Sequence, residues 1–167
     1  MGSPTVSDIV DSNLIVSNDA PGIFPPGITV VIWTATDASD NKATATTTVT
    51  ATYNFSGVLQ PINSDDSSVF KFGSTIPVKF QLKDYYGNYV TNDVAKIFAA
   101  KISNNIIGSY AEAALTSAAT TGNLFKYDPT ANQYIFNLAT KGLSTGTWQI
   151  KIQLGDSQEY TVNISLK

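Results

Sequence analysis

Apolar and polar residues alternate with a period of two along the first third of the chain. In residues 28–37, each of the two alternating sets of side chains contains apolar residues. Turn-forming residues follow at 37–41, and residues 42–52 then alternate Ala or Val with Thr. Successive side chains of a β-strand point to opposite faces of a sheet. The pattern predicts a β-hairpin with one solvent-exposed face. In the first strand of this hairpin, one face carries Val31, Trp33 and Ala35. The other face carries Val30, Ile32 and Thr34.

The same period returns in the last two thirds of the chain, where it predicts further short strands. Turn residues at 84–88, with Gly87, and at 128–132, with Pro129, separate neighbouring strands. Residues 93–119 are ambiguous, because Phe98 and its neighbours alternate as a strand does while 111–119 are rich enough in Ala, Glu and Leu for a short helix. The expected inward sets are Val78, Phe80 and Leu82; Trp148, Ile150, Ile152 and Leu154; and Tyr160, Val162, Ile164 and Leu166.

These strands predict an all-β fold of two immunoglobulin-like β-sandwich modules in tandem, the first of them incomplete. The Thr- and Ala-rich strand ends near Tyr53, and an irregular segment follows at 54–68. We therefore expect modules at 4–52 and 53–167, with residues 1–3, Met-Gly-Ser, as an expression remnant. A complete sandwich needs about seven strands, and 4–52 has room for four or five.

An incomplete sandwich needs something to cover its open face, and the sequence leaves three alternatives. The first module packs against the second, pairs with a strand donated by a neighbouring copy, or lacks strands that lie outside this sequence. Val30 and Ile32 are the residues whose exposure would favour association, since unpaired strand edges beside apolar surface promote it.

Composition excludes most site chemistries. The chain has no Cys and no His, and its 10 basic residues are all Lys. Thiol and imidazole catalysis, and Cys- or His-based metal centres, therefore cannot be built. A net charge of -3 without Arg makes nucleic acid a poor partner, and no apolar run is long enough for membrane insertion. We expect no enzyme and no cofactor. A surface rich in Thr, Ser and Asn favours an extracellular or cell-surface location.

Residues 24–41, FPPGITVVIWTATDASDN, with the Thr/Ala strand that follows, resemble the C-terminal half of a hyalin-repeat (HYR) domain. The resemblance covers 4–52, and Asp40 stands where that family usually has Gly. It implies an immunoglobulin-like, extracellular module associated with adhesion.

Residues 73–80, GSTIPVKF, carry the Pro-x-Lys-Phe signature of the PxKF family. Supporting segments are 53–57, YNFSG; 122–134, GNLFKYDPTANQY; and the strand pair at 142–167. The resemblance covers 53–167 and implies a C-terminal module of a large secreted prokaryotic protein, with no activity attached.

Asp37, Asp40 and Asn41 bring oxygen ligands together within five residues, as a calcium site would. Calcium needs six to eight oxygens, and this loop supplies about three. A plain hairpin turn explains the same residues, because Asp and Asn bond locally to backbone. The acidic pair Asp65 and Asp66 allows the same two interpretations.

Tyr85, Tyr86 and Tyr89 cluster around one turn and cannot all point inward. They are candidates for stacking on a sugar or for contacting a protein, and partial burial between modules is the alternative. Glu112 and Glu159 belong to no recognisable catalytic pair.

Two function classes remain. One is a non-enzymatic structural or adhesive module of a large secreted or cell-surface protein, as a spacer, surface-layer or fibre element, whose partners are the other domains of its parent. The other is an accessory carbohydrate- or calcium-binding module of a secreted enzyme. An exposed aromatic row favours the second class, and a flat Thr/Asn surface favours the first.

Overall fold

The computed structural model describes residues 2–114 and 122–167. Contacts between Cα atoms divide the chain into two units, Met1–Thr52 and Tyr53–Lys167.

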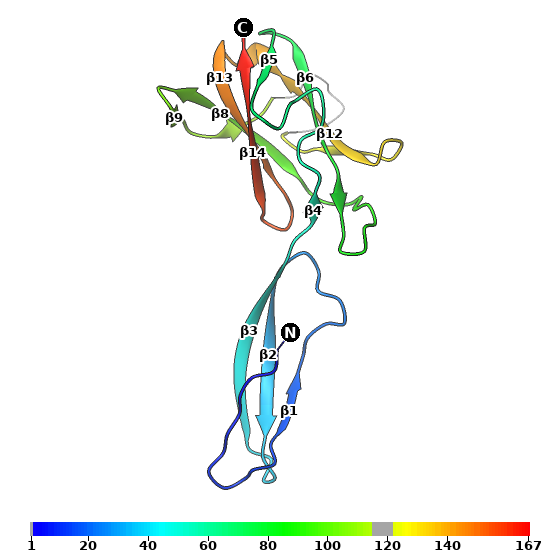
Figure 1. Ribbon diagram of the computed structural model, residues 1–167, viewed down its shortest axis with the longest axis vertical. Helices are drawn as coiled ribbons and strands as arrows, with labels where there is room; N and C mark the ends of the chain where they lie inside the picture. Colours follow the sequence, from blue (N-terminus) through cyan, green and yellow to red (C-terminus); the bar gives the residue numbers. More distant parts are fainter. Residues whose placement is uncertain (1, 115–121) are drawn as a thin grey trace. The chain divides into compact units, whose positions relative to one another are not determined.

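Unit 1 is built on one three-stranded antiparallel sheet (Figure 1). Its strands are β1 (Ile15–Asn18), β2 (Gly27–Thr36) and β3 (Lys42–Ala51), in the order β1-β2-β3. Strands β2 and β3 pair over their full length, with Val31 opposite Thr47 and Trp33 opposite Ala45. The hairpin predicted from the alternating pattern is therefore confirmed.

The two faces of this sheet differ in what covers them. Val31 and Trp33 are buried on one face, whereas Ile28, Val30 and Ile32 on the other face are exposed. The alternating pattern predicted that one face of the hairpin would be exposed and the other covered, but the second face is covered only in part. Ala43 and Ala45 share the face of Trp33 and are exposed as well, because unit 1 has no second sheet to cover them.

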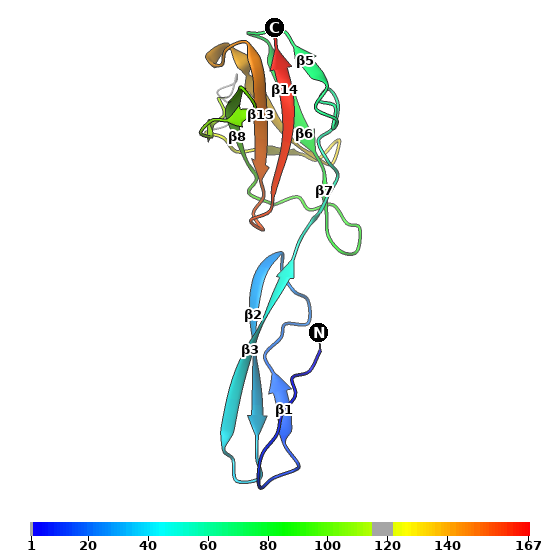
Figure 2. The same ribbon diagram turned by 60° about the vertical axis from the view of Figure 1, so that its left-hand side comes forward.

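Unit 2 is a β-sandwich whose larger sheet has the order β10-β8-β13-β14-β5, with β9 paired to β8. Strands β13 and β14 form its long central hairpin (Figure 2). Strand β5 pairs with β14 in parallel. The strands of this sheet are β5 (Ser68–Phe70), β8 (Lys96–Ser103), β9 (Ile106–Ile107), β10 (Ala111–Glu112), β13 (Gly146–Gln153) and β14 (Glu159–Leu166).

The facing layer contains a three-stranded sheet in the order β11-β12-β6 and the short pair β4-β7. The bounds are β4 (Asn54–Phe55), β6 (Thr75–Phe80), β7 (Leu82–Lys83), β11 (Lys126–Asp128) and β12 (Gln133–Ala139). A 3-10 turn, η1 (Thr140–Gly142), follows β12.

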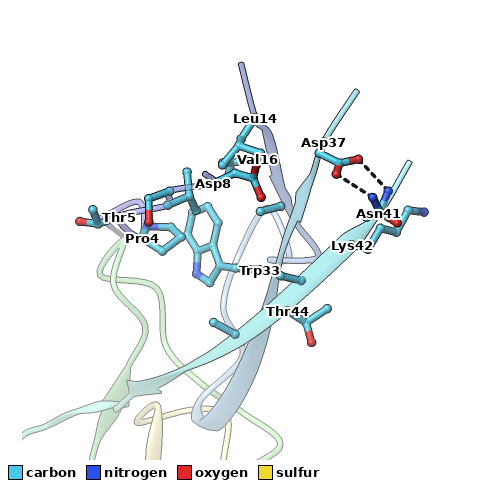
Figure 3. Close-up of a pocket in the computed structure, with 15 residues that line it drawn as sticks. Pro4, Thr5, Asp8, Leu14, Val16, Trp33, Asp37, Asn41, Lys42 and Thr44 are labelled. Atoms are coloured by element: carbon cyan, nitrogen blue, oxygen red, sulfur yellow. Dashed lines mark hydrogen bonds between the residues drawn. The ribbon is translucent and has the colours of Figure 1, made fainter. Parts of the chain in front are cut away.

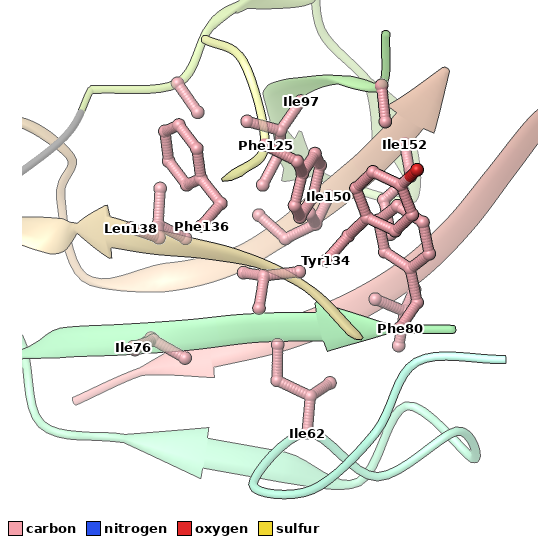
Figure 4. Packing of buried hydrophobic residues seen from close by; sticks show 14 of the residues in the cluster. Ile62, Ile76, Phe80, Ile97, Phe125, Tyr134, Phe136, Leu138, Ile150 and Ile152 are labelled. Atoms are coloured by element: carbon pink, nitrogen blue, oxygen red, sulfur yellow. The ribbon is translucent and has the colours of Figure 1, made fainter. Parts of the chain in front are cut away.

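The core of unit 2 lies between these layers (Figure 4). Phe80 is its aromatic centre: its ring stacks on Tyr134 at 5.1 Å, with 9° between the planes, and meets the edge of Phe125 at 4.8 Å. The inward sets expected for residues 78–82, 148–154 and 160–166 all face this core, with Trp148 and Tyr160 partly buried at its margin.

The ambiguous segment 93–119 is a strand where its structure is described. Ile97 and Ala99 face the core from β8, so Phe98, whose alternation suggested a strand, lies on the outer face. The helix considered for 111–119 is wrong at its start, because Ala111 and Glu112 form β10 and pair with β8. Residues 115–119 lie outside the described part of the chain.

The fold class expected from the sequence is confirmed: the chain is all-β, with two immunoglobulin-like modules in tandem and the first incomplete. Among the described residues, η1 is the sole helical segment. Unit 2 has both layers of a sandwich, and unit 1 has one sheet.

Candidate functional site

The calcium candidates form a five-residue hairpin turn between β2 and β3. The Asp37 N–H donates to the Asn41 carbonyl at 3.1 Å, and the Asp40 N–H donates to the Asp37 carbonyl at 3.1 Å. Asp40 has φ 62°, the left-handed conformation that Asp tolerates better than most residues. The structure thus brings Asp37, Asp40 and Asn41 into one turn.

Both carboxylate oxygens of Asp37 bond within this turn (Figure 3). Oδ1 accepts the N–H groups of Ser39 and Asn41 at 2.8 Å each, and Oδ2 accepts Asn41 Nδ2 at 2.8 Å. These donors lower the pKa of Asp37, the Asn41 side chain having the largest effect. The carboxylate acts as the acceptor that shapes the hairpin. Within the described residues, no three acidic side chains converge as metal ligands.

The same turn occurs in unit 2 at residues 84–88. The Asp84 N–H donates to the Asn88 carbonyl at 2.9 Å, and the Gly87 N–H donates to the Asp84 carbonyl at 3.1 Å. Asp84 Oδ1 accepts the N–H groups of Tyr86 and Asn88, and Oδ2 accepts Asn88 Nδ2. Gly87 takes the left-handed position with φ 85°. Both turns could be predicted from the sequence, but the sequence did not indicate that they have the same pattern of hydrogen bonds.

The three tyrosine candidates differ in exposure. Tyr85 is 94% exposed, Tyr86 is 67% exposed and Tyr89 is 39% exposed. The rings of Tyr85 and Tyr86 meet edge to face at 5.4 Å, and the Lys83 ammonium lies 4.9 Å from the centre of the Tyr89 ring. The structure therefore places two of the three at the tip of a turn and the third at its base.

A pocket of about 420 Å³ lies in unit 1, against the face of the sheet that carries Trp33 (Figure 3). Residues 4–8 form one wall, and Trp33, Ala35 and residues 41–45 contribute others. Trp33 is only 7% exposed, and its indole Nε1 is a buried donor with no partner among the residues that the structure describes. Sequence reasoning missed this pocket because residues 4–8 carry no periodic signal.

Two carboxylates lie at one end of unit 2. Asp156 is buried, and it accepts the Tyr53 N–H at 3.1 Å and the Gln158 N–H at 3.0 Å. Asp93 Oδ1 accepts the Gly155 N–H at 3.0 Å. Burial raises the pKa of Asp93, and the charge of Asp156 adds to this rise. Burial also raises the pKa of Tyr134, to about 12. Asp156 thus fastens the start of unit 2 to the β13–β14 turn, and Asp93 bonds to the same turn at Gly155.

Polar groups on the outer face of the larger sheet bond to one another. Lys151 Nζ lies 2.9 Å from Glu159 Oε1 and 4.4 Å from the centre of the Tyr110 ring. The Tyr110 hydroxyl bonds to Gln149, and Asp66 accepts two hydrogen bonds from Asn163. Glu112 lies exposed on β10, and Asp65 accepts bonds from Ser67. Within the described residues this network is a bonded surface, and no group of three acidic side chains gathers in it as a metal site would need.

The comparisons with known proteins bear on unit 1. Residues 2–51 match the family model of the HYR domain. The HYR part of the resemblance is therefore supported, and the matched range falls entirely within unit 1.

The solved structures add a weaker likeness. One similar structure is described as "Structure of surface layer protein SbsC, domains 4-9", with 13% identity and a TM-score of 0.38. The alignment covers 98% of this chain and 23% of that one, so this chain spans about a quarter of its length. A likeness this low carries no argument here. The search of curated proteins found no match. No helix among the described residues is long and apolar enough to cross a membrane.

Proposed function

We propose that this chain is a non-enzymatic structural or adhesive part of a larger secreted or cell-surface protein, serving as a spacer, surface-layer or fibre element. The observation that carries the proposal is the HYR match over residues 2–51. The bonding of the candidate side chains supports it, because the Asp37 and Asp84 carboxylates and the Lys151–Glu159 pair hold turns and strands.

Unit 2 is, in this proposal, a module of the PxKF type. Two residues of the signature have clear structural roles that support this assignment. Phe80 is fully buried at the centre of the aromatic cluster, and Pro77 lies in β6 opposite Asn137. Lys79 lies on the opposite face of β6 from Phe80. A prokaryotic, extracellular origin follows from this assignment.

The arrangement of β5 and β14 suits a load-bearing spacer. The C-terminal strand β14 lies between β13 and β5, and the pairing with β5 is parallel. Two further bonds extend it: the Lys167 N–H donates to the Phe70 carbonyl, and the Phe72 N–H donates to the Lys167 carbonyl. A pull on Lys167 along the strand loads these bonds together in shear. Bonds loaded together resist more force than bonds that open one at a time.

Force spectroscopy on the full chain tests this role. The chain has no cysteine, so a Lys167→Cys handle is unique. We expect unit 2 to unfold in one step that releases about 400 Å of chain, at roughly 3.6 Å per residue. The control places the handle at Ser157→Cys, in the β13–β14 turn, where the pull peels β14 from its end. Equal unfolding forces for both handles would refute the load-bearing role.

Neighbouring copies are proposed as further partners through strand pairing at β3. This strand is at the edge of its sheet, spans 10 residues and has one charged residue, Lys42. Ile28, Val30 and Ile32 lie exposed beside it on β2. Long, uncharged edges are templates for another strand. Sedimentation velocity should show reversible self-association that Val30→Lys abolishes. A wild-type monomer at millimolar concentration would contradict it.

A further inference from the structure

The two equivalent turns show which of their residues the turn itself requires. Both begin with Asp and end with Asn, and both have a left-handed residue in fourth place. The second and third residues differ completely: Ala38 and Ser39 in one turn, Tyr85 and Tyr86 in the other. These two positions enter the hydrogen bonds within the turn only through the backbone N–H of the third residue. The turn therefore forms equally well without tyrosine.

Tyr85 and Tyr86 also add little to the core of unit 2. Neither belongs to the core or packs against it, and their ring contact is with each other. Large aromatic side chains normally gain their stabilisation by burial. These two rings are exposed to water, and the hydrogen bonds of the turn fix the backbone that carries them. Exposed aromatic rings on a rigid turn are typical of a contact surface.

The charges around the tip indicate a neutral partner. The Asp84 carboxylate accepts bonds at both oxygens from its own turn. The Lys83 ammonium, one residue before the turn, lies over the Tyr89 ring. The tip thus offers two exposed rings, with 83° between their planes, and two hydroxyl groups. Sugar rings complement this set, since their C–H faces pack on aromatic rings and their hydroxyls both donate and accept hydrogen bonds.

The size of the tip argues against a folded protein as the partner. At about 200 Å² for a fully buried Tyr, the exposed parts of Tyr85 and Tyr86 offer about 300 Å². A stable protein–protein interface buries about 800 Å² on each side. Each of the two rings can instead stack on the face of one sugar unit. Weak contacts of this kind gain avidity when a surface displays many copies.

We propose that Tyr85 and Tyr86, presented by the turn at 84–88, bind the sugar rings of a neutral polysaccharide. Tyr89 and Lys83 at the base of the turn flank the contact. This binding is separate from the load-bearing role of β5 and β14, so either can fail while the other stands.

Affinity electrophoresis of the full chain tests the proposal. Native gels would contain laminarin, xyloglucan or galactomannan, and pelleting assays would use cellulose and chitin. The variant Tyr85→Ala/Tyr86→Ser gives the turn the residues that already stand at 38 and 39. We expect retardation of the wild type on at least one polysaccharide and affinity about tenfold lower in the variant, since 1.4 kcal/mol is a factor of ten and a ring contact is worth about that much. Tyr85→Phe, which keeps the ring, should retain binding.

A reverse graft sharpens the result. Ala38→Tyr/Ser39→Tyr in the binding-deficient variant moves the pair to the equivalent turn of unit 1, and we expect it to restore part of the retardation. Unchanged melting of every variant confirms the fold. The proposal is overturned if no neutral polysaccharide retards the wild type, if the tyrosine-free variant binds equally well, or if only an acidic polysaccharide such as polygalacturonate binds. It is also overturned if the variant loses only self-association, which would make a second copy the partner.

Discussion

Replacement of Phe80 by Ala should destabilise unit 2 and leave unit 1 unchanged. Phe80 is fully buried, and its ring lies within 5.3 Å of the rings of Phe55, Phe125 and Tyr134. Alanine would leave a cavity bounded by three other aromatic rings, which cannot collapse into it without breaking their own contacts. A core Phe→Ala change of this kind costs about 3–5 kcal/mol.

The expected shift in melting temperature follows from the size of unit 2. At about 2.1 cal/mol/K per residue, a unit of roughly 115 residues has an unfolding entropy of about 0.24 kcal/mol/K. A loss of about 4 kcal/mol therefore lowers its melting temperature by about 17 °C.

Each unit contains one tryptophan, which makes the assay specific. Trp33 lies in unit 1 and Trp148 in unit 2. Thermal melts followed by fluorescence in Trp148→Phe report unit 1, and those in Trp33→Phe report unit 2. We expect Phe80→Ala to lower the Trp148 transition by about 17 °C and to leave the Trp33 transition in place. Equal shifts of both transitions would refute the division into two independent cores.

Three further predictions concern the carboxylates. Asp156→Ala should lower the stability of unit 2 by about 2 kcal/mol, because two backbone N–H groups lose their buried acceptor; urea denaturation followed at Trp148 measures this, and a loss within error would contradict it. Burial raises the pKa of Asp93 above 3.8, so the folded state binds its proton more readily than the unfolded state. The contribution of Asp93 to stability should therefore increase as pH falls from 7 through the raised pKa, and Asp93→Asn should remove that increase; an identical pH profile in the variant would show that Asp93 is not its source. The melting temperature of unit 1, followed at Trp33, should be the same in millimolar calcium as in chelator, because the Asp37 carboxylate bonds within its own turn. A rise of several degrees that disappears in Asp37→Ala would overturn that interpretation.

The candidate sites were predictable from the sequence in position but not in role. Asp37 and Asn41 were recognisable as turn formers and as oxygen ligands, and the two readings use the same atoms. Asp37 Oδ1 and Oδ2 both accept hydrogen bonds within the turn, which favours the turn, and calcium binding stays a prediction for the melting experiment. Likewise, the clustering of Tyr85 and Tyr86 was visible in the sequence, but their exposure depends on where the turn projects from the folded unit.

The sequence by itself determined the longer alternating strands at 28–52, 78–82, 148–154 and 160–166, and in the last three also the inward faces. Alternation is a local property, and a strand whose apolar residues recur every second position has one register that buries them, as Val162, Ile164 and Leu166 do in β14. The sequence alone also excluded thiol and imidazole chemistry, since the chain has no Cys and no His.

Only the tertiary structure decided which strands pair and what each face meets. The parallel pairing of β5 with β14 joins Ser68 to Ile164, nearly a hundred residues away, and no local pattern encodes that choice. The alternation around Phe98 correctly indicated a strand. The Phe98 side chain, however, lies on the outer face of the sheet, under the Lys151 ammonium. The Trp33 pocket likewise exists because residues 4–8, which have no periodicity, lie against one sheet without a second. Periodicity reports which side chains share a face, and packing between distant segments decides whether that face is covered.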